Sequence, residues 1–278
     1  MVLRRRSVVI IAGAAVVLGV VAYSQLRPYL FSTASNTTLS AQEVRNHFLD
    51  HVSTTTVQVA VSDAPTETAS SVPVVDIGPT LPRFGIYVYD TAGGDSVDAL
   101  KGQRHIYPAT TTITIVPFGC GVLARWDVLK ARWQESQRCV VGHSISLPTH
   151  TTHDEFFGRG QTDTYECTGD GRPVNVPINA SFSYVCTQAG ATDAYSGVVV
   201  GTESLLVGGI TVHTLHVRVS IDSGTPTDSQ VTDSWFQIGT DLLIAQVTTN
   251  ATSNSSVVGV VHYEEQYELH LRSLDPQV

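Results

Sequence analysis

The sequence predicts a mainly β, predominantly antiparallel domain that follows an N-terminal transmembrane helix and a short juxtamembrane helix. Three observations support this prediction. From residue 84 onward, short runs of β-branched and aromatic residues are separated by turns rich in glycine, aspartate and asparagine. Near the N-terminus, three arginines precede a long uncharged run. All four cysteines lie in the β-rich part of the 278-residue chain.

The N-terminal segment has the features of a signal anchor. Arg4 to Arg6 precede an uncharged run from Ser7 to Leu26, which at about 1.5 Å per residue spans a bilayer core of roughly 30 Å. Because arginines favour the cytoplasmic side, we expect a cytoplasmic tail (1–6), a transmembrane signal anchor (7–31) and a C-terminal domain outside the cell membrane. The alternative is a signal peptide that is cleaved near Ala22-Tyr23-Ser24.

Residues 32–82 predict a juxtamembrane helix followed by a linker. Ser40 and Glu43 have the spacing of a capping box, in which each side chain accepts a hydrogen bond at the start of a helix. The apolar residues of one helical face follow: Val44, Phe48, Leu49 and Val52. From 53 to 82 the chain is rich in Thr, Ser, Ala and Pro, which is typical of a linker.

The extracytoplasmic β domain is expected to span 83–278. Runs rich in β-branched and aromatic residues, several of them with period two, predict its strands. These runs are 84–90, 110–116, 181–186, 195–207, 210–221, 233–238, 242–249 and 257–271. Gly208-Gly209 predicts a tight hairpin turn between two of them, because glycine readily adopts the positive φ that such turns need.

Two disulfides are predicted. Cys120, Cys139, Cys167 and Cys186 make an even number in a compartment that is expected to be oxidising. Of the three possible pairings, Cys120 with Cys139 is favoured, because the residues between them fit an antiparallel hairpin. Cys167 then pairs with Cys186 and closes an irregular loop that contains Gly-Asp-Gly and two prolines. A structural zinc site is not favoured, because it normally uses close Cys-x-x-Cys pairs.

The first hairpin also predicts a register. If its two cysteines face each other, Trp126 faces Trp133, both indoles share the face of the disulfide, and a six-residue loop spans 127–132. The alternative is a short helix, because Trp126, Leu129 and Trp133 also fit one helical face.

The sequence contains little that indicates catalysis. His150, His153 and Asp154 form the one local group of candidate metal ligands, and the alternative is that these histidines lie on a strand or in a surface loop. No cofactor is predicted. The net charge of −9, with no basic stripe beyond Arg4 to Arg6, argues against nucleic-acid binding.

Two stretches carry a resemblance to a protein family. They are "GIYVYDTAGGDSVDALKGQRHIYPATTTITIVPFGCGVLARWDVLKARWQESQRC" and "HDEFFGRGQTDTYEC". The order Tyr-x-Tyr-x-Thr-x-Gly, His-x-Tyr-Pro, Cys-Gly, then Arg-Trp twice before a cysteine resembles a group of uncharacterised, membrane-anchored extracytoplasmic proteins of actinobacteria. It covers roughly residues 84–167. Because that group has no known activity, the resemblance implies a location and a fold.

The C-terminal half resembles the last strands of lipoprotein-carrier-like half-barrel domains. The residues that carry this resemblance are a strand with Gly-x-Glu-x-x-x-x-Gly-Gly and a tryptophan strand that ends in Gly-Thr-Asp-Leu. The resemblance implies a curved, half-barrel-like antiparallel sheet that holds an apolar ligand in its concave face. The candidate ligand-binding residues are Tyr87, Tyr89, Trp235 and Phe236, with core packing as the alternative role of each.

The expected protein is therefore a non-enzymatic, single-pass protein of the cell envelope. Its N-terminal helix inserts in the membrane, and its external domain binds an apolar ligand (a lipid or glycolipid) or a partner protein. Two alternatives remain open at this point. A structural interaction module of an envelope complex predicts an exposed apolar patch. A metal-dependent enzyme predicts a metal at His150 and His153.

Overall fold

A computed structural model describes residues 34–54, 79–174, 177–189, 191–222, 228–256 and 259–277 of the chain. The elements are α2 (Ala41–Thr54), β1 (Gly85–Val97), β2 (Gln103–Ile106), β3 (Thr110–Phe118), β4 (Gly121–Leu129), β5 (Arg132–Val141), β6 (Ser144–Phe156), β7 (Arg159–Gly169), β8 (Arg172–Pro173), β9 (Ser181–Gln188), β10 (Ala191–Val207), β11 (Ile210–Asp222), β12 (Ser229–Gln237), β13 (Leu243–Ser256) and β14 (Gly259–Leu271). The predicted cytoplasmic tail, the transmembrane anchor and most of the predicted linker lie outside the described residues. Within the described ranges, no helix is both long and apolar enough to cross a bilayer.

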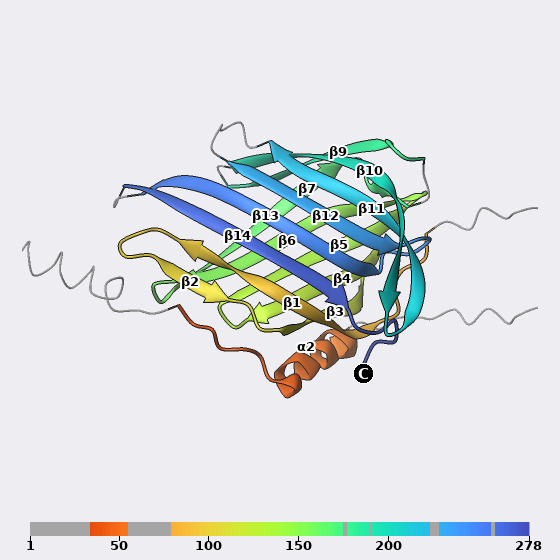
Figure 1. Cartoon of the computed structure of the whole chain (residues 1–278), viewed down its shortest axis with the longest axis horizontal. Helices are drawn as coiled ribbons and strands as arrows, with labels where there is room; N and C mark the ends of the chain where they lie inside the picture. Colours follow the sequence, from red (N-terminus) through yellow and green to blue (C-terminus); the bar gives the residue numbers. More distant parts are fainter. Residues whose placement is uncertain are drawn as a thin grey trace, which may run out of the picture.

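The β-sheet closes into a barrel (Figure 1). Twelve strands pair antiparallel in the order β1-β3-β4-β5-β6-β7-β9-β10-β11-β12-β13-β14, and β14 returns to pair with β1. The short β2 pairs with the second half of β1, beyond the end of β3. The prediction of a mainly β, antiparallel domain is confirmed. The half-barrel form is wrong, because the two edges of the sheet pair with each other, which removes edges that a half-barrel would leave unpaired.

Every run predicted as a strand lies largely within a strand of the barrel, whereas β6 and β7 were not predicted. Both strands carry polar residues on both faces, since their inner face lines a polar cavity and their outer face meets solvent. They therefore lack the apolar alternation that marks a half-buried strand. The predicted hairpin turn is confirmed: Gly208 and Gly209 connect β10 to β11 with φ of 57° and 83°.

The β4–β5 hairpin has a different register from the predicted one. The disulfide Cys120–Cys139 is present, with a Cα–Cα distance of 5.1 Å, but Cys139 lies opposite Gly121. Trp126 consequently pairs with Gln134, and Trp133 pairs with Asp127 near a two-residue turn. A shift of one residue reverses the face of a side chain, so Trp126 lies inside the barrel and Trp133 outside it. The predicted tryptophan pair and six-residue loop are wrong, and so is the helical alternative.

The second disulfide joins neighbouring strands of the barrel. Cys167 on β7 lies directly opposite Cys186 on β9, with a Cα–Cα distance of 4.0 Å. The described residues between the two strands include β8, which pairs with β6 rather than with its sequence neighbours. Both predicted disulfide pairings are therefore confirmed.

Helix α2 begins at the predicted capping box. The backbone N–H of Ser40 donates to Glu43 Oε2 at 2.8 Å, and the backbone N–H of Glu43 donates to Ser40 Oγ at 3.2 Å. The apolar side chains of Val44 and Phe48 then pack on the outer surface of β1, β3 and β4, against Ile86, Val116 and Leu123. Helix α2 is therefore docked on the barrel.

The main hydrophobic core fills only part of the barrel. Its side chains come chiefly from β1, β3, β4 and β14 and from the β12–β13 turn. Tyr89, which is fully buried, donates a hydrogen bond from its hydroxyl to the carbonyl of Leu243 at 2.8 Å. Elsewhere in the barrel, side chains chiefly from β5 to β14 surround a cavity.

We predict that Phe48→Ala undocks α2 without opening the barrel. Phe48 is 6% exposed, and the loss of a buried phenyl ring costs about 3 kcal/mol. Hydrogen exchange followed by mass spectrometry should show faster exchange in residues 41–54 and unchanged protection in the barrel strands. The control is Leu49→Ala, because Leu49 is 44% exposed on the same helix. Equal acceleration by both substitutions would contradict this packing.

Candidate functional site

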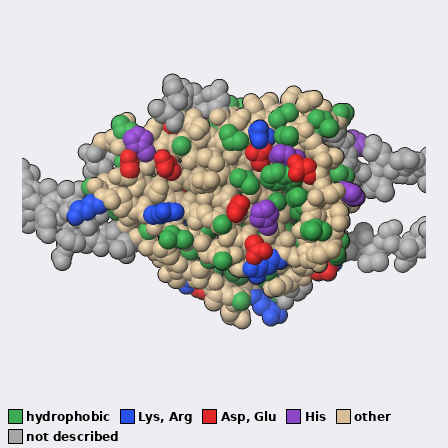
Figure 2. Space-filling view, viewed as in Figure 1, with side chains coloured by type: hydrophobic (Ala, Val, Ile, Leu, Met, Phe, Trp, Pro, Cys, Tyr) green, Lys and Arg blue, Asp and Glu red, His purple; other side chains and the backbone are tan. Residues whose placement is uncertain are grey.

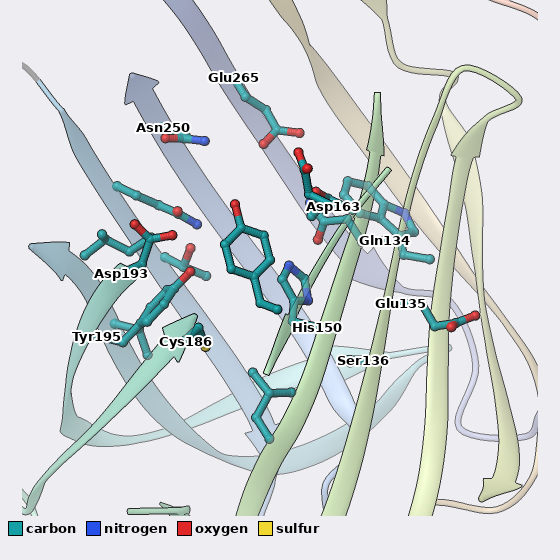
Figure 3. A pocket seen from close by; sticks show the side chains of 18 of the residues that line it. Gln134, Glu135, Ser136, His150, Asp163, Cys186, Asp193, Tyr195, Asn250 and Glu265 are labelled. Atoms are coloured by element: carbon teal, nitrogen blue, oxygen red, sulfur yellow. The ribbon is translucent and has the colours of Figure 1, made fainter. Parts of the chain in front are cut away.

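The cavity inside the barrel is the candidate functional site. Its volume is about 920 Å³, and inward side chains from β5 to β14 line it. Figure 3 shows His150, Asp193 and Tyr195 directed toward a common space, with Glu265 at its far side. Glu135, by contrast, points away from that space and pairs with Arg125 at 3.6 Å. Cavities of a few hundred to about 1,000 Å³ commonly hold small-molecule ligands.

Two arginines and one aspartate, here called the basic cluster, lie at one end of the cavity. Arg138 Nη1 is 3.1 Å from Asp241 Oδ2, and Arg172 Nη2 contacts the other carboxylate oxygen. The guanidinium of Arg172 also stacks on Phe236, with Cζ 3.7 Å from the ring centroid. Because one carboxylate faces two guanidinium groups, the cluster has a net charge of +1. The Arg172 side chain is 10% exposed and that of Asp241 is 2% exposed.

The loop closed by Cys167–Cys186 carries Arg172 into the barrel. Its β8 segment pairs with β6, so that Arg172 lies opposite Ile145. Gly171 is needed at this crossing, because a Cβ there would lie 3.0 Å from the backbone of Ile145. The disulfide and the glycine together bring the loop close enough for Arg172 to line the cavity.

A second charged cluster, in which negative charges predominate, lies at the start of β5. Arg132 and Arg138 are six residues apart in this strand, which corresponds to about 20 Å. Arg132 Nη2 is 2.9 Å from Glu265 Oε1. Its Nε is 3.1 Å from Asp154 Oδ1 and 3.8 Å from Asp95 Oδ2. One guanidinium therefore faces three carboxylates, and we call these four residues the acidic cluster.

Two of the three carboxylates, those of Asp95 and Glu265, also form hydrogen bonds with residues outside the cavity lining. Asp95 Oδ1 is 2.6 Å from His105 Nδ1, and the hydroxyl of Tyr107 donates to Glu265 Oε1. The side chains of Asp95, His105 and Glu265 are at most 3% exposed. Asp154, at 31% exposed, is the most accessible carboxylate of this cluster, and Glu265 also lines the cavity.

Asp154 and His150, both in the cavity wall, have shifted pKa values. Burial raises the pKa of Asp154 from 3.8 to about 6, opposed by Arg132 and reinforced by Glu265. Burial also lowers the pKa of His150 from 6.5 to about 4, and the positive charges of Arg132 and Arg138 add to this effect. His150 is therefore neutral at pH 7, when Asp154 is mostly ionised.

Aromatic side chains occupy the wall formed by β7, β9 and β10, and we call them the aromatic band. Tyr184 stacks on Tyr195, with ring centroids 4.6 Å apart, and Phe182 follows at 6.5 Å from Tyr184. The hydroxyl of Tyr165 accepts a hydrogen bond from Gln188 Nε2 at 3.0 Å. Burial raises the pKa of Tyr165 to about 12 and also raises the pKa values of Tyr184 and Tyr195. The band is therefore uncharged and offers both ring faces and hydroxyl groups.

The four aromatic residues proposed from the sequence separate into three environments. Tyr87 and Tyr89 are 1% and 0% exposed and belong to the hydrophobic core. Trp235 lies outside the cavity lining and stacks on His216, with ring centroids 4.3 Å apart. Phe236, the next residue, lines the cavity beneath Arg172. Of the four, only Phe236 is placed to contact a ligand in the cavity.

The three candidate metal ligands are not brought together. His150 and Asp154 line the cavity, whereas His153 stacks on Trp133 with centroids 5.3 Å apart and meets Thr162 Oγ1 at 2.8 Å. Residues three apart on a strand point to opposite faces, which explains the separation. In the described part of the chain, no group of three or more His, Cys, Asp or Glu side chains is arranged to hold a metal ion.

Sequence reasoning identified Asp154 but not the residues of the basic cluster. Arg138, Arg172 and Asp241 come from β5, a loop and a turn that are far apart in the chain. No local motif joins them. The Gly-Asp-Gly before Arg172 was the available signal, since it indicates a close backbone approach.

Comparisons with known proteins do not assign a family. No protein-family model matches the sequence. No curated protein matches it. Among solved structures, the chain is similar to the crystal structure of the hypothetical lipoprotein YmcC from Escherichia coli (K12), with 11% sequence identity and a TM-score of 0.30, covering 63% of this chain and 86% of that chain. A similarity of this size does not bear on the ligand of the cavity.

We predict that His150 and Asp154 change the pH dependence of stability in opposite directions. The raised pKa of Asp154 makes the fold lose stability as the pH rises from about 4 to about 6, because the folded state binds the proton more tightly. The lowered pKa of His150 makes the fold lose stability as the pH falls from about 6.5 to about 4. In the wild-type protein these two effects offset each other.

Urea unfolding between pH 4 and pH 7 tests this prediction. Asp154→Asn should make the slope of unfolding free energy against pH more positive, and His150→Gln should make it more negative, each by about 1 kcal/mol per pH unit near pH 5. Thr152→Ser, at a cavity-lining position between them on β6, is the control and should leave the slope unchanged. Slopes that move in the same direction would refute the assignment.

Proposed function

We propose that this protein is a non-enzymatic binding protein of the cell envelope, which holds an amphipathic small molecule inside its barrel. The observation that carries the proposal is the cavity of about 920 Å³. Its wall combines an uncharged aromatic band with charged clusters about 20 Å apart along β5. This lining suits a ligand that has both an apolar or aromatic body and a polar group, such as a glycolipid, better than a wholly apolar one.

The two disulfides support an extracytoplasmic location, because such bonds persist in oxidising compartments. The proposed anchor at 7–31 is followed by the short segment 32–40, and α2 then begins at Ala41. Since α2 is docked on the barrel, an anchor at this position would hold the cavity close to the membrane surface. A binding protein in this place could exchange an amphipathic ligand with the bilayer.

An interaction module remains the second candidate, on the basis of one surface feature. Leu206 and Ile210 flank the glycine turn of the β10–β11 hairpin and are 74% and 59% exposed. Ile238, whose N–H donates to the carbonyl of His213, is 40% exposed nearby. On the face shown in Figure 2, however, apolar side chains occur in small groups between charged ones. This distribution favours the cavity over the surface as the binding site.

We predict that filling the cavity abolishes ligand retention. The full chain, secreted into an oxidising compartment, should carry an additional mass in native mass spectra that organic extraction removes. Thr232→Trp, which places an indole in the cavity, should lose that mass. Val231→Trp is the matched control, because the adjacent Val231 is 40% exposed and absent from the cavity lining. A bare wild-type chain that also binds no added amphiphile would contradict the proposed function.

A further inference from the structure

We infer that the basic cluster is an anion-binding subsite, which takes the carboxylate or phosphate group of the amphipathic ligand. The inference rests on the proposed function and adds the chemical class and the orientation of the ligand. The anionic group would lie between Arg138 and Arg172, and the body of the ligand would extend along the aromatic band.

The basic cluster has one positive charge more than it can pair internally. Buried charges in proteins are normally paired, because an unpaired ion loses its hydration without compensation. Among the described residues, Asp241 is the carboxylate paired with either arginine, so one positive charge has no counterpart. An anionic ligand group would supply it.

Arg172 has hydrogen-bonding capacity that the described residues do not use. Its Nη2 pairs with the carboxylate of Asp241, and the ring of Phe236 covers one face of the guanidinium. Its Nη1 is buried and has no hydrogen-bond partner in the described part of the chain. Buried donors of this kind are costly to leave unpaired, and a guanidinium presents its donors in a planar fork that matches carboxylate and phosphate oxygens.

A disulfide closes the loop that carries this arginine. Arg172 lies in the loop that the Cys167–Cys186 disulfide closes, and Cys186 itself lines the cavity. Gly171 allows the loop to approach β6 closely. The disulfide and the glycine together hold the backbone that carries Arg172 against β6.

The other charged cluster sets the orientation. The acidic cluster has one guanidinium against three carboxylates, so a second anion is disfavoured there. Asp163 and Asp193 also line the cavity (Figure 3). An anionic group is therefore attracted only to the end of the cavity that holds the basic cluster. The neutral His150 and the tyrosine hydroxyls offer hydrogen bonds to uncharged polar parts of the ligand.

Calorimetric titration of the full chain in nanodiscs, with empty nanodiscs subtracted, tests the inference. The probes are decanoate, decyl phosphate, the neutral analogue decanol, and inorganic phosphate. We expect decanoate and decyl phosphate to bind about tenfold more tightly than decanol, because each can form charge-assisted hydrogen bonds with the unpaired guanidinium. Binding of inorganic phosphate alone, with no gain from a decyl chain, would assign the subsite to a free anion instead of a lipid-like headgroup.

Three variants test whether the preference for anionic probes arises at the basic cluster. Arg172→Gln should weaken decanoate binding about tenfold and leave decanol binding unchanged. Arg218→Gln is the matched control, because Arg218 forms an equivalent pair with Asp233 (2.9 Å) but is 53% exposed on the outer face. Asp241→Asn removes the competing carboxylate and should strengthen decanoate binding several-fold, a gain that misfolding cannot produce.

The titrations distinguish failure of the anion subsite from failure of the proposed function. Equal binding of decanoate and decanol, with no effect of Arg172→Gln, would overturn the anion subsite and leave the barrel as a binding protein. Failure of every probe to bind the wild-type chain would overturn the proposed function and the subsite together.

Discussion

The pairing of β1 with β14 is the constraint on which the rest of the structure depends. It joins the first and last long strands of the domain from Tyr89 opposite Leu271 to Val97 opposite Tyr263. Once these strands pair, every inward side chain of twelve strands faces one enclosed interior. Polar groups that would meet bulk water on an open sheet then pair with each other, with water inside the barrel or with a ligand. The charged clusters follow from that requirement.

The interior is divided between a packed core and a cavity by the residues that the strands supply. Strands β1, β3, β4 and β14 provide large apolar and aromatic side chains, such as Ile113 and Trp126, which fill their side. Strands β6 and β7 provide threonines, carboxylates and histidine, which do not pack as a hydrophobic core. The position of the cavity is therefore set by the inner faces of particular strands.

The same polar lining explains which strands and site residues sequence reasoning could find. Where the inner face is apolar, as in β11, alternation marks the strand; where it is polar, as in β6, alternation disappears. Phe236 lines the cavity, whereas its neighbour Trp235 faces outward, because adjacent strand residues point to opposite sides. His150 and His153 were grouped by proximity in the chain and are separated by the same rule.

By itself, the sequence determined the β class, the tight turn at Gly208-Gly209, the capping box at Ser40 and Glu43 and both disulfide pairings. These features depend on residues close together in the chain, or on a pairing that spacing alone favours. Closure of the barrel, the one-residue register of β4 with β5 and the meeting of Arg172 with Asp241 were decided only by the tertiary structure. Each depends on contacts between distant segments or on the exact register of strands, which are selected by the fit of the whole sheet and not by any local pattern.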